Sequence, residues 1–476
     1  MPDGSTGDDG PPDEGGGGGR LIVLSNRIPK GDVPAGGLVH AVHEALTGAG
    51  GIWIGAADPT DAAGPGLTQI GDGAYERHTF ELTHEEHRRY YLGYANSVLW
   101  PLFHHRSDLL RIEEGDFEAY ATVNRRVARA IARILRPDDV VWVHDYHFLM
   151  VAKELRDLGV RNRIGLFLHI PVPAASEVMA LPQVALLPGW VVAHDLFGVQ
   201  TRRDVAAMRD LLRADDATQM LNDGSFIRKG RIVRVLSFPI GIDAEAFARD
   251  AEAAVLPRLT LERDAPLLLG VDRLDYSKGL VHRFEAFGHY LEHRQEGAPR
   301  PTFLQIAPTS RGDVDAYRDI REELERAAGH LNGQHAQLDW VPIRYVNSHV
   351  DRAVIAGLYR RAAVCLVTPL ADGMNLVAKE FVAAQDPDDP GVLVLSHFAG
   401  AAEQLDAALM VNPFDHGNFA SAIARALAMP RAERVRRHAA LRRTVFEKDI
   451  GWWTQSYLKR LSEAPRSVER RLRVIN

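Results

Sequence analysis

The sequence has a single cysteine, no long apolar run and no excess of positive charge. The only cysteine, Cys365, lies inside an apolar run, so an internal disulfide is impossible and the thiol is expected to be buried and inert. The net charge of -7 gives no basic surface for nucleic acid. No apolar stretch is long enough to span a membrane, and the N-terminus lacks the basic-then-apolar order of a signal peptide. We therefore expect a cytoplasmic protein without nucleic-acid or membrane partners.

The length of 476 residues is too great for one hydrophobic core and predicts two domains. Apolar residues make up 46% of the chain and charged residues 25%, which is typical of a globular protein. Residues 1–19 hold no large apolar side chain except the initiator Met and are expected to be a disordered tail. We predict an N-terminal domain at 20–240, a C-terminal domain at 241–450 and a C-terminal helical segment at 451–476.

Short apolar strands alternate with helical stretches along most of the chain, which indicates an α/β protein with parallel sheets covered on both faces. Ligands bind such sheets at the carboxyl ends of the strands. The predicted strands cover residues 20–27, 52–55, 140–143, 164–168, 195–199 and 232–236 in the first half, and 267–271, 303–307, 364–367, 391–395 and 408–411 in the second. The predicted helices include 38–46, 116–135, 148–158 and an aromatic-rich helix around Trp452 to Leu461.

Several polar side chains follow predicted strands of the first half. They are His144, Asp145, His169 and Gln200. For Asp145 and His169, the position fits a catalytic or orienting group and equally fits a hydrogen bond within the core. His144 and His147 stand three residues apart, but no acidic or cysteine partners follow at zinc spacing, so we predict no metal.

The stretch from Leu366 to Glu380 has the order of a buried strand, a glycine turn and a helix start. The free N–H groups and the dipole at such a helix start attract phosphate and sugar oxygens. Asp372 and Glu380 add two carboxylates that can accept hydrogen bonds from sugar hydroxyls. An ordinary connection between strand and helix is the alternative interpretation.

Two cations follow the strand at 267–271. Arg273 and Lys278 stand five positions apart, and an Arg fork with a compact Lys charge suits a diphosphate. Either residue alone would be typical of a solvated surface. Together with the loop at 369–380, they predict the two halves of one nucleotide-sugar site.

Three further segments carry weaker signals. Gly36 and Gly37 separate the first strand from a helix without the spacing of a dinucleotide-binding motif. Arg311 follows a strand and fits either an anion site or a local ion pair. Tyr91 and Trp100 lie in a polar-aromatic segment whose alternative interpretation is surface packing.

A series of longer motifs then occurs in a fixed order. They are SNR (25–27), AGGL (35–38), SVLWPLFH (97–104), WVHDYH (142–147), FLHIP (167–171), RLDYSKG (273–279), QIAPTSRGDV (305–314), DGMNLVAKE (372–380) and VLVLSHFAGAAEQL (392–405). Through them the chain resembles the trehalose-6-phosphate synthase family from Arg20 to about Leu461. These are retaining glycosyltransferases of the GT-B fold, in which two Rossmann-like domains face each other across a deep cleft. The resemblance also implies that the C-terminal helix packs back on the N-terminal domain.

The resemblance implies a role for each matching residue. On the donor side, Arg273 and Lys278 match the cations that hold the diphosphate. Asp372 and Glu380 match the carboxylates that accept from the glucose and ribose hydroxyls, respectively. The backbone that meets the phosphates is matched by Asn375, Leu376 and Val377, and Gly37 matches a loop glycine that meets the donor. On the acceptor side, Arg27, Tyr91, Trp100 and Arg311 match the phosphate-holding set, and Asp145 the contact to the acceptor hydroxyl. His169 matches a contact to the donor sugar near the reacting centre, and Gln200 a polar group in the cleft. The implied catalytic set is Asp145, His169, Arg273, Lys278 and Asp372.

The activity implied by the resemblance is transfer of glucose from a nucleoside-diphospho-glucose, most often UDP-glucose, to glucose 6-phosphate. The product would be α,α-trehalose 6-phosphate, formed by front-face attack without a cofactor or a metal. A homo-oligomer, dimer or tetramer, is usual in the family. Two departures are Ala371, where an Arg is common, and Asp272, where a Glu is common. Two alternatives stay open: another phosphorylated acceptor such as glycerol phosphate, and a non-catalytic sugar-phosphate sensor.

Overall fold

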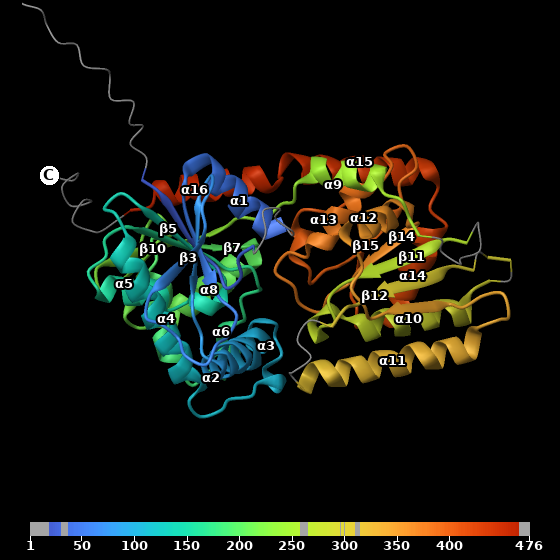
Figure 1. The fold of residues 1–476 in the computed structure, drawn as a ribbon. Helices are drawn as coiled ribbons and strands as arrows, with labels where there is room; N and C mark the ends of the chain where they lie inside the picture. Colours follow the sequence, from blue (N-terminus) through green and yellow to red (C-terminus); the bar gives the residue numbers. More distant parts are fainter. Residues whose placement is uncertain are drawn as a thin grey trace, which may run out of the picture.

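The computed structural model describes residues 19–29, 37–257, 265–295, 297–298, 300–309 and 315–465. Apart from Gly19, the predicted tail lies outside the described residues. Two sheets lie side by side, each with helices on its faces (Figure 1). The fold class predicted from the sequence, two Rossmann-like units of the α/β class, is confirmed. Within the described ranges, no helix has both the length and the apolar character that crossing a membrane requires.

Among the described residues, the first sheet has ten strands, which come from the N-terminal half of the chain. In spatial order they are β3 (Leu67–Gly71), β4 (Glu76–Phe80), β2 (Gly51–Ala56), β1 (Leu21–Leu24), β5 (Val140–His144), β6 (Arg163–Phe167), β7 (Leu196–Val199), β10 (Arg231–Ser237), β9 (Phe226–Arg228) and β8 (Thr218–Met220). The strands from β4 to β10 pair in parallel, and antiparallel strands extend both edges. Every residue of β1 is buried, because helices cover both faces at the centre of the sheet.

In the part of the chain that the structure describes, the second sheet has six strands, all parallel. In spatial order they are β13 (Ile343–Val346), β12 (Thr302–Ile306), β11 (Leu267–Val271), β14 (Val364–Val367), β15 (Val392–Ser396) and β16 (Leu409–Val411). β11, β12, β14 and β15 are buried along their whole length, which explains why they are continuous apolar runs in the sequence.

The helices divide between the two sheets. With the first sheet go α1 (Gly37–Ala49), α2 (His84–Glu86), α3 (Trp100–Phe103), α4 (Asp116–Ile134), α5 (Val151–Asp157), α6 (Ala175–Val178), α7 (Leu187–Val192) and α8 (Arg202–Arg213). With the second go α9 (Ala244–Ala253), α10 (Leu280–His293), α11 (Asp315–His335), α12 (Arg352–Arg361), α13 (Leu376–Ala384), α14 (His416–Leu427) and α15 (Arg431–Glu447). α9, α12, α13 and α15 pack together on one side of the second sheet, whereas α10, α11 and α14 lie on the other (Figure 1).

The described residues also hold six helical segments of other types. They are the π-helix η1 (His87–Leu99) and the 3-10 turns η2 (Ser107–Leu109), η3 (Tyr146–Phe148), η4 (Val184–Leu186), η5 (Tyr276–Lys278) and η6 (Gly400–Glu403). π-Helical geometry is rare and frequently occurs at functional sites, and η1 carries the candidate residue Tyr91.

The last described helix, α16 (Ile450–Ser462), returns to the first sheet and packs against α1, β6 and β7 (Figure 1). Its Trp453 and Tyr457 side chains are fully buried. Tyr457 stacks on Trp142 of β5 with ring centroids 5.0 Å apart, and Trp453 meets Phe167 of β6 edge-to-face at 4.9 Å. The predicted packing of the C-terminal helix on the N-terminal half is confirmed.

The chain crosses between the two halves after β10 and again before α16, and the two crossings touch. Ile450 donates its backbone N–H to the carbonyl of Ile242 at 3.1 Å. The buried ammonium of Lys379 on α13 donates to the carbonyl of Ile240 at 2.6 Å. Burial and, to a smaller extent, the charge of Lys448 together lower the pKa of Lys379 to about 7. The crossings lie close to the predicted domain limits at 240 and 450, which stay predictions.

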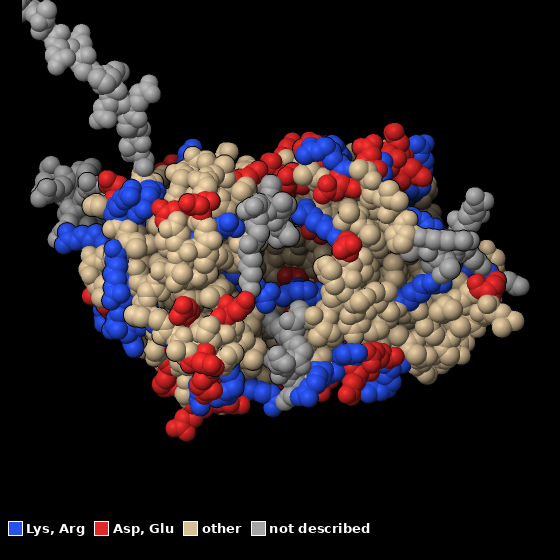
Figure 2. Space-filling view, viewed as in Figure 1, with Lys and Arg blue, Asp and Glu red and all other residues tan. Residues whose placement is uncertain are grey.

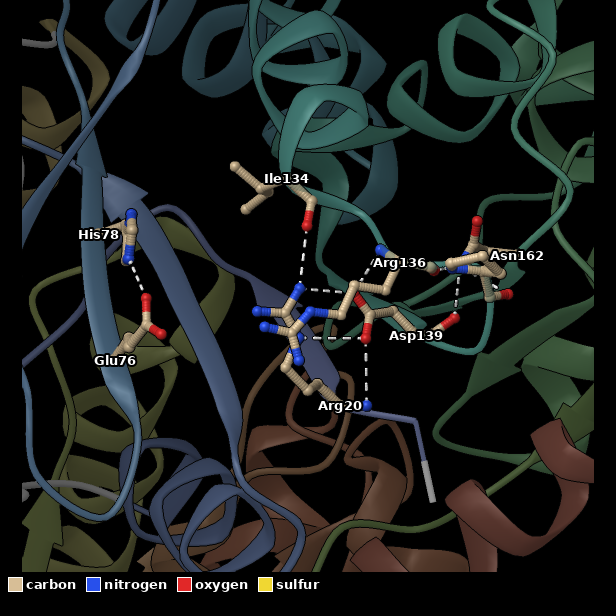
Figure 3. Close-up of polar contacts among 8 residues, drawn as sticks. Arg20, Glu76, His78, Ile134, Arg136, Asp139 and Asn162 are labelled. Atoms are coloured by element: carbon tan, nitrogen blue, oxygen red, sulfur yellow. Dashed lines mark hydrogen bonds and ion pairs between the residues drawn. The ribbon is translucent and has the colours of Figure 1, made fainter. Parts of the chain in front are cut away.

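A polar cluster fixes the first described residues to the sheet (Figure 3). The carboxylate of Asp139, in the turn before β5, accepts from the backbone N–H of Arg20 at 3.1 Å and from its guanidinium at 2.8 Å. It also accepts from the backbone N–H of Arg136 at 2.8 Å. Burial acts to raise the pKa of Asp139, but the bonds from Arg20 and Arg136 outweigh it and lower the pKa. These contacts position β1, whose end leads into the cleft.

All the predicted strands are present, with ends shifted by a few residues, but the described residues hold five further strands that were not predicted. β3, β4, β8, β9 and β13 carry exposed or half-exposed polar residues, so they lack an apolar run. The predicted helix at 148–158 is shorter than expected, because η3 precedes it and α5 begins only at Val151.

Candidate active site

The carboxyl ends of the parallel strands in both halves lead to one cleft. Figure 2 shows a hollow between the two halves with Lys, Arg, Asp and Glu side chains inside it. The loops after β1, β5 and β6 come from the first sheet, and those after β11 and β14 from the second. This arrangement brings most of the residues singled out in the sequence to one place.

The loop between β14 and α13 has the predicted order of strand, turn and helix start. Asn375, the residue before α13, has a φ of 68°, a left-handed conformation that turns the chain sharply into the helix. The backbone N–H groups of Leu376 and Val377 open α13 and have no acceptor within the helix. This helix start, with its partial positive charge, is a site for phosphate oxygens.

Lys278, Asp372 and Asn375 form a polar cluster at this helix start. The Lys278 ammonium pairs with Oδ2 of Asp372, and Nδ2 of Asn375 donates to the same oxygen at 3.0 Å. The two charged side chains are only 10% and 13% exposed, so solvent screens the pair weakly. The loops that carry them are also joined, because Leu370 donates its N–H to the carbonyl of Ser277 at 2.7 Å.

A buried set of side chains that the sequence reasoning missed supports the Lys278 loop. The fully buried Arg283 of α10 pairs with Asp272 at 2.7 Å and donates to the Lys278 carbonyl at 3.1 Å. Asp275 accepts from the backbone N–H of Ser277 and from the hydroxyl of Tyr317, both at 2.9 Å. Asp272, already singled out in the sequence, is therefore the ion-pair partner of Arg283. Arg283 carries no motif signal of its own because it stands within a helix.

Arg273 reaches across the cleft to an aromatic ring of the other half. Its guanidinium lies 5.5 Å from the ring centroid of Trp100, at the start of α3. Trp100 is 5% exposed, so the alternative of surface packing is wrong for this residue. Beneath it, the buried His104 ring lies 4.0 Å away, and burial lowers the pKa of His104 to about 4. A cation–π contact at such a buried ring fixes the position of Arg273.

The two halves come into close contact between Gly373 and His169. A Cβ atom on Gly373 would lie 1.9 Å from the carbonyl oxygen of His169, so only glycine fits there. Gly400 packs equally closely against Gly373 itself, where a Cβ atom would lie 1.7 Å from its carbonyl oxygen. The Asp372 loop and the His169 loop therefore face each other directly.

His169 belongs to a chain of hydrogen-bonded groups. Its Nε2 lies 3.1 Å from Nδ1 of the buried His144, and the two rings stack with centroids 5.4 Å apart. Its backbone N–H donates to Oδ1 of Asp145 at 3.3 Å. Burial lowers the pKa of His169 to about 3, and burial followed by the neighbouring His169 lowers that of His144. Both rings are therefore neutral near pH 7.

Asp145 adopts an unusual backbone conformation for a residue with a side chain. Its φ is 72° and its ψ 173°, and its N–H donates to the carbonyl of Phe167 at 2.8 Å. Strained backbone of this kind persists where the surroundings fix it and is common at functional sites. The carboxylate is partly exposed beside His169, which fits the predicted position at a strand end.

Arg27 and Tyr91 meet on the N-terminal side of the cleft. A guanidinium nitrogen of the exposed Arg27 donates to the Tyr91 hydroxyl at 3.2 Å. The Tyr91 ring lies in η1, between the rings of His87 at 5.1 Å and His147 at 5.7 Å, both stacked. The π-helical turn places Tyr91 so that its hydroxyl faces Arg27.

Four other predicted residues are placed differently. Gly37 begins α1, just after residues that are not described, and Arg311 lies outside the described residues. Glu380 lies in the second turn of α13 and is partly buried, and burial raises its pKa. Gln200 is buried and accepts from the Ile240 backbone N–H at 3.0 Å, so its role here is to hold the chain crossing.

Comparison with known families and structures fits this geometry. Residues 26–463 match the model of glycosyltransferase family 20. The chain belongs to glycosyltransferase family 20. A trehalose-6-phosphate synthase of Klebsiella pneumoniae subsp. pneumoniae is 44% identical over 462 residues, which cover 95% of this chain and 98% of the relative.

Two solved structures are similar to nearly the whole chain. The trehalose-6-phosphate enzyme from E. coli, bound with UDP-2-fluoro glucose, has a TM-score of 0.89 and 43% identity, covering 93% of this chain and 98% of that one. An alpha,alpha-trehalose-phosphate synthase (UDP-forming) from Burkholderia xenovorans in complex with glucose-6-phosphate has a TM-score of 0.86 and 43% identity. The match covers 93% of this chain and 100% of that one. Both bound molecules belong to the substrate classes that the sequence resemblance implies.

Proposed function

We propose that this chain transfers glucose from a nucleoside-diphospho-glucose to glucose 6-phosphate, with retention, to form α,α-trehalose 6-phosphate and a nucleoside diphosphate. The observation that carries the proposal is the meeting of Arg273, Lys278 and the start of α13 on one wall of the cleft. His169 and Asp145 stand on the opposite wall. A family-20 relative bound with a UDP-glucose analogue and another bound with glucose-6-phosphate support this choice of substrates.

The donor binds, in this proposal, to the C-terminal wall. Lys278 and Arg273 hold the diphosphate, together with the N–H groups of Leu376 and Val377. Because Lys278 pairs with Asp372 here, donor binding exchanges this partner for phosphate oxygens and frees Asp372 to accept glucose hydroxyls. Glu380, one turn into α13, accepts the ribose hydroxyls. Gly37, at the start of α1, meets the donor from the other half.

The acceptor binds, in this proposal, to the N-terminal wall. Arg27 and the Tyr91 hydroxyl already form a hydrogen-bonded pair that presents donors to a phosphate group. Trp100 and Arg311 complete the phosphate-holding set. Asp145, beside His169, accepts a hydrogen bond from the attacking hydroxyl and orients it towards the donor sugar.

The reaction proceeds on one face of the donor sugar. The bond from the anomeric carbon to the diphosphate oxygen breaks, and the bond to the acceptor oxygen forms on the same face. The proton of the acceptor hydroxyl passes to the departing phosphate oxygen. Lys278 and Arg273 stabilise the negative charge that develops on the leaving group. With a pKa of about 3, His169 is neutral, so it contacts the donor sugar by hydrogen bonding and supplies no proton near pH 7.

The finer points of the proposal rest on the relatives and on the resemblance. The Burkholderia xenovorans relative is described as UDP-forming, which supports uridine as the donor base. Homo-oligomeric assembly, a cytoplasmic location and the domain limits at 20–240, 241–450 and 451–476 are carried forward as proposals. Size-exclusion chromatography with light scattering tests the assembly, and cell fractionation tests the location.

The test of the proposed function is release of nucleoside diphosphate by the purified chain. UDP-glucose, GDP-glucose and ADP-glucose are each supplied with glucose 6-phosphate, with glycerol 3-phosphate or with no acceptor. We expect UDP release that requires glucose 6-phosphate. Release of nucleoside diphosphate with glycerol 3-phosphate but not with glucose 6-phosphate would show that glycerol 3-phosphate is the acceptor. Binding of glucose 6-phosphate without nucleoside diphosphate release from any donor would identify a sensor instead.

A further inference from the structure

Two helices of the C-terminal half, α10 and α14, bring two histidines and a carboxylate together. His282 and Glu285 stand one turn apart near the start of α10, and His416 is the first residue of α14. Nδ1 of His282 lies 2.9 Å from Nε2 of His416. Oε2 of Glu285 lies 3.6 Å from the first of these nitrogens and 3.2 Å from the second. The same three atoms therefore form a closed triangle, one from each side chain.

The triangle has the dimensions of one face of a tetrahedral metal site. Zinc bound to His nitrogens and carboxylate oxygens at about 2.0 to 2.2 Å holds its ligand atoms about 3.3 to 3.6 Å apart. The three observed separations, 2.9, 3.2 and 3.6 Å, bracket this value. A point equidistant from the three atoms in their plane lies about 1.9 Å from each, so an ion at bonding distance sits just above that plane.

The surroundings leave the fourth position of such a site open. The side chains of His282, Glu285 and His416 are 27%, 45% and 26% exposed, so an ion reaches them from solvent. His289, one turn beyond Glu285 on α10, has its ring centroid 6.0 Å from that of His416. It lines a groove of about 690 Å³ between α10 and α14. Water from the solvent side can complete the coordination.

We infer that His282, Glu285 and His416 bind a divalent cation of the zinc class, with water as the fourth ligand. Two imidazoles and one carboxylate form a ligand set that zinc commonly uses, and softer or harder ions prefer thiolates or all-oxygen sets. The ion would join the first turns of α10 and α14, the helices that follow β11 and β16 in the chain. This inference is independent of the proposed glycosyl transfer, because none of the three residues lies among the donor or acceptor contacts.

The position of the site gives the ion a structural role next to the donor loop. α10 follows Gly279 directly, so His282 stands four residues after Lys278 in the chain. Clamping the first turn of α10 to α14 would hold the end of the loop that carries Arg273 and Lys278. A metal that binds only the folded chain raises its stability by mass action.

The test is a zinc titration of the full chain after removal of metal with a chelator. Isothermal calorimetry and thermal unfolding are followed for the natural chain, the double variant His282→Ala/His416→Ala and the milder variant Glu285→Gln. His293→Ala is the matched control, because His293 lies exposed on the same helix outside the triangle. Cobalt replaces zinc in a parallel sample, since its visible spectrum distinguishes four-coordinate binding.

We expect about one tight equivalent of zinc per chain, a rise in the unfolding temperature with zinc, and a four-coordinate cobalt spectrum. Glu285→Gln should weaken the tight binding at least about 10-fold, and the double variant at least about 100-fold. His293→Ala should leave it unchanged. Equal zinc affinity and stoichiometry in the natural chain and the double variant would show that zinc binds other surface histidines. Absence of tight zinc binding in the natural chain would show that His282 and His416 form only a hydrogen bond. Either result overturns the inference.

Discussion

Replacing Lys278 by Met tests whether the Lys278 ammonium stabilises the negative charge that develops on the leaving group. The ammonium lies in a site where it and Asp372 are 10% and 13% exposed, so an effective dielectric constant near 20 applies rather than that of water. A unit charge about 4 Å from the developing negative charge then contributes about 4 kcal/mol. Arg273 and the start of α13 remain in the variant and compensate in part. We therefore expect kcat to fall at least about 100-fold, and at most about 1,000-fold.

The assay is nucleoside diphosphate release at saturating donor and acceptor, with thermal unfolding to show that the variant is folded. Lys153→Met is the matched control, because Lys153 also pairs with an aspartate, Asp157, but on the exposed surface of α5. This control should keep its turnover. A turnover of Lys278→Met within about threefold of the natural chain would refute the assignment of the charge.

Three further changes follow from contacts in the structure. Gly373→Ala places a methyl carbon 1.9 Å from the His169 carbonyl oxygen, so the two loops must move apart. Activity should fall at least about 10-fold while the far-ultraviolet circular dichroism spectrum stays unchanged. Activity equal to that of the natural chain would show that the two loops separate freely. Asp139→Asn removes the carboxylate that holds Arg20 and should lower the free energy of unfolding by about 2 kcal/mol at pH 7. Because the pKa of Asp139 is lowered in the folded chain, this difference is present above pH 3.8 and should shrink as the pH falls below it, which urea unfolding at several pH values checks. The pKa of Lys379 is lowered from 10.5 to about 7 in the folded chain, so the unfolded chain binds more protons between these two pH values. The contribution of Lys379 to the free energy of unfolding therefore rises with pH across that window, and Lys379→Met should lack this rise. An identical dependence of stability on pH in both chains would contradict this prediction.

The alternation of apolar strands and helices was enough to predict the fold, because central parallel strands such as β1 and β11 are buried on both faces and read as continuous apolar runs. The edge strands escaped prediction for the opposite reason. β3, for example, exposes Thr68 and Gln69 and has no apolar pattern to detect. The π-helix η1 was also beyond prediction, since no residue pattern distinguishes it from an α-helix.

The candidate site was predictable where its residues follow a strand directly. Arg273, Lys278 and Asp372 could be placed at strand ends from the sequence, although the ion pair between two of them joins residues 94 positions apart. Contacts that depend on how distant elements pack could not be predicted. Gly373 against His169 is one such contact, and His282 beside His416, 134 positions away, is another.

The most direct test of the central claim is the identity of the product made from UDP-glucose and glucose 6-phosphate. Carbon and proton NMR of the purified product reports both the linkage and the configuration at each anomeric carbon. The account predicts a non-reducing disaccharide phosphate with both anomeric carbons in the α configuration, formed in equal amount to UDP. A β configuration at the transferred glucose, a reducing product, or UDP release without any disaccharide would contradict it.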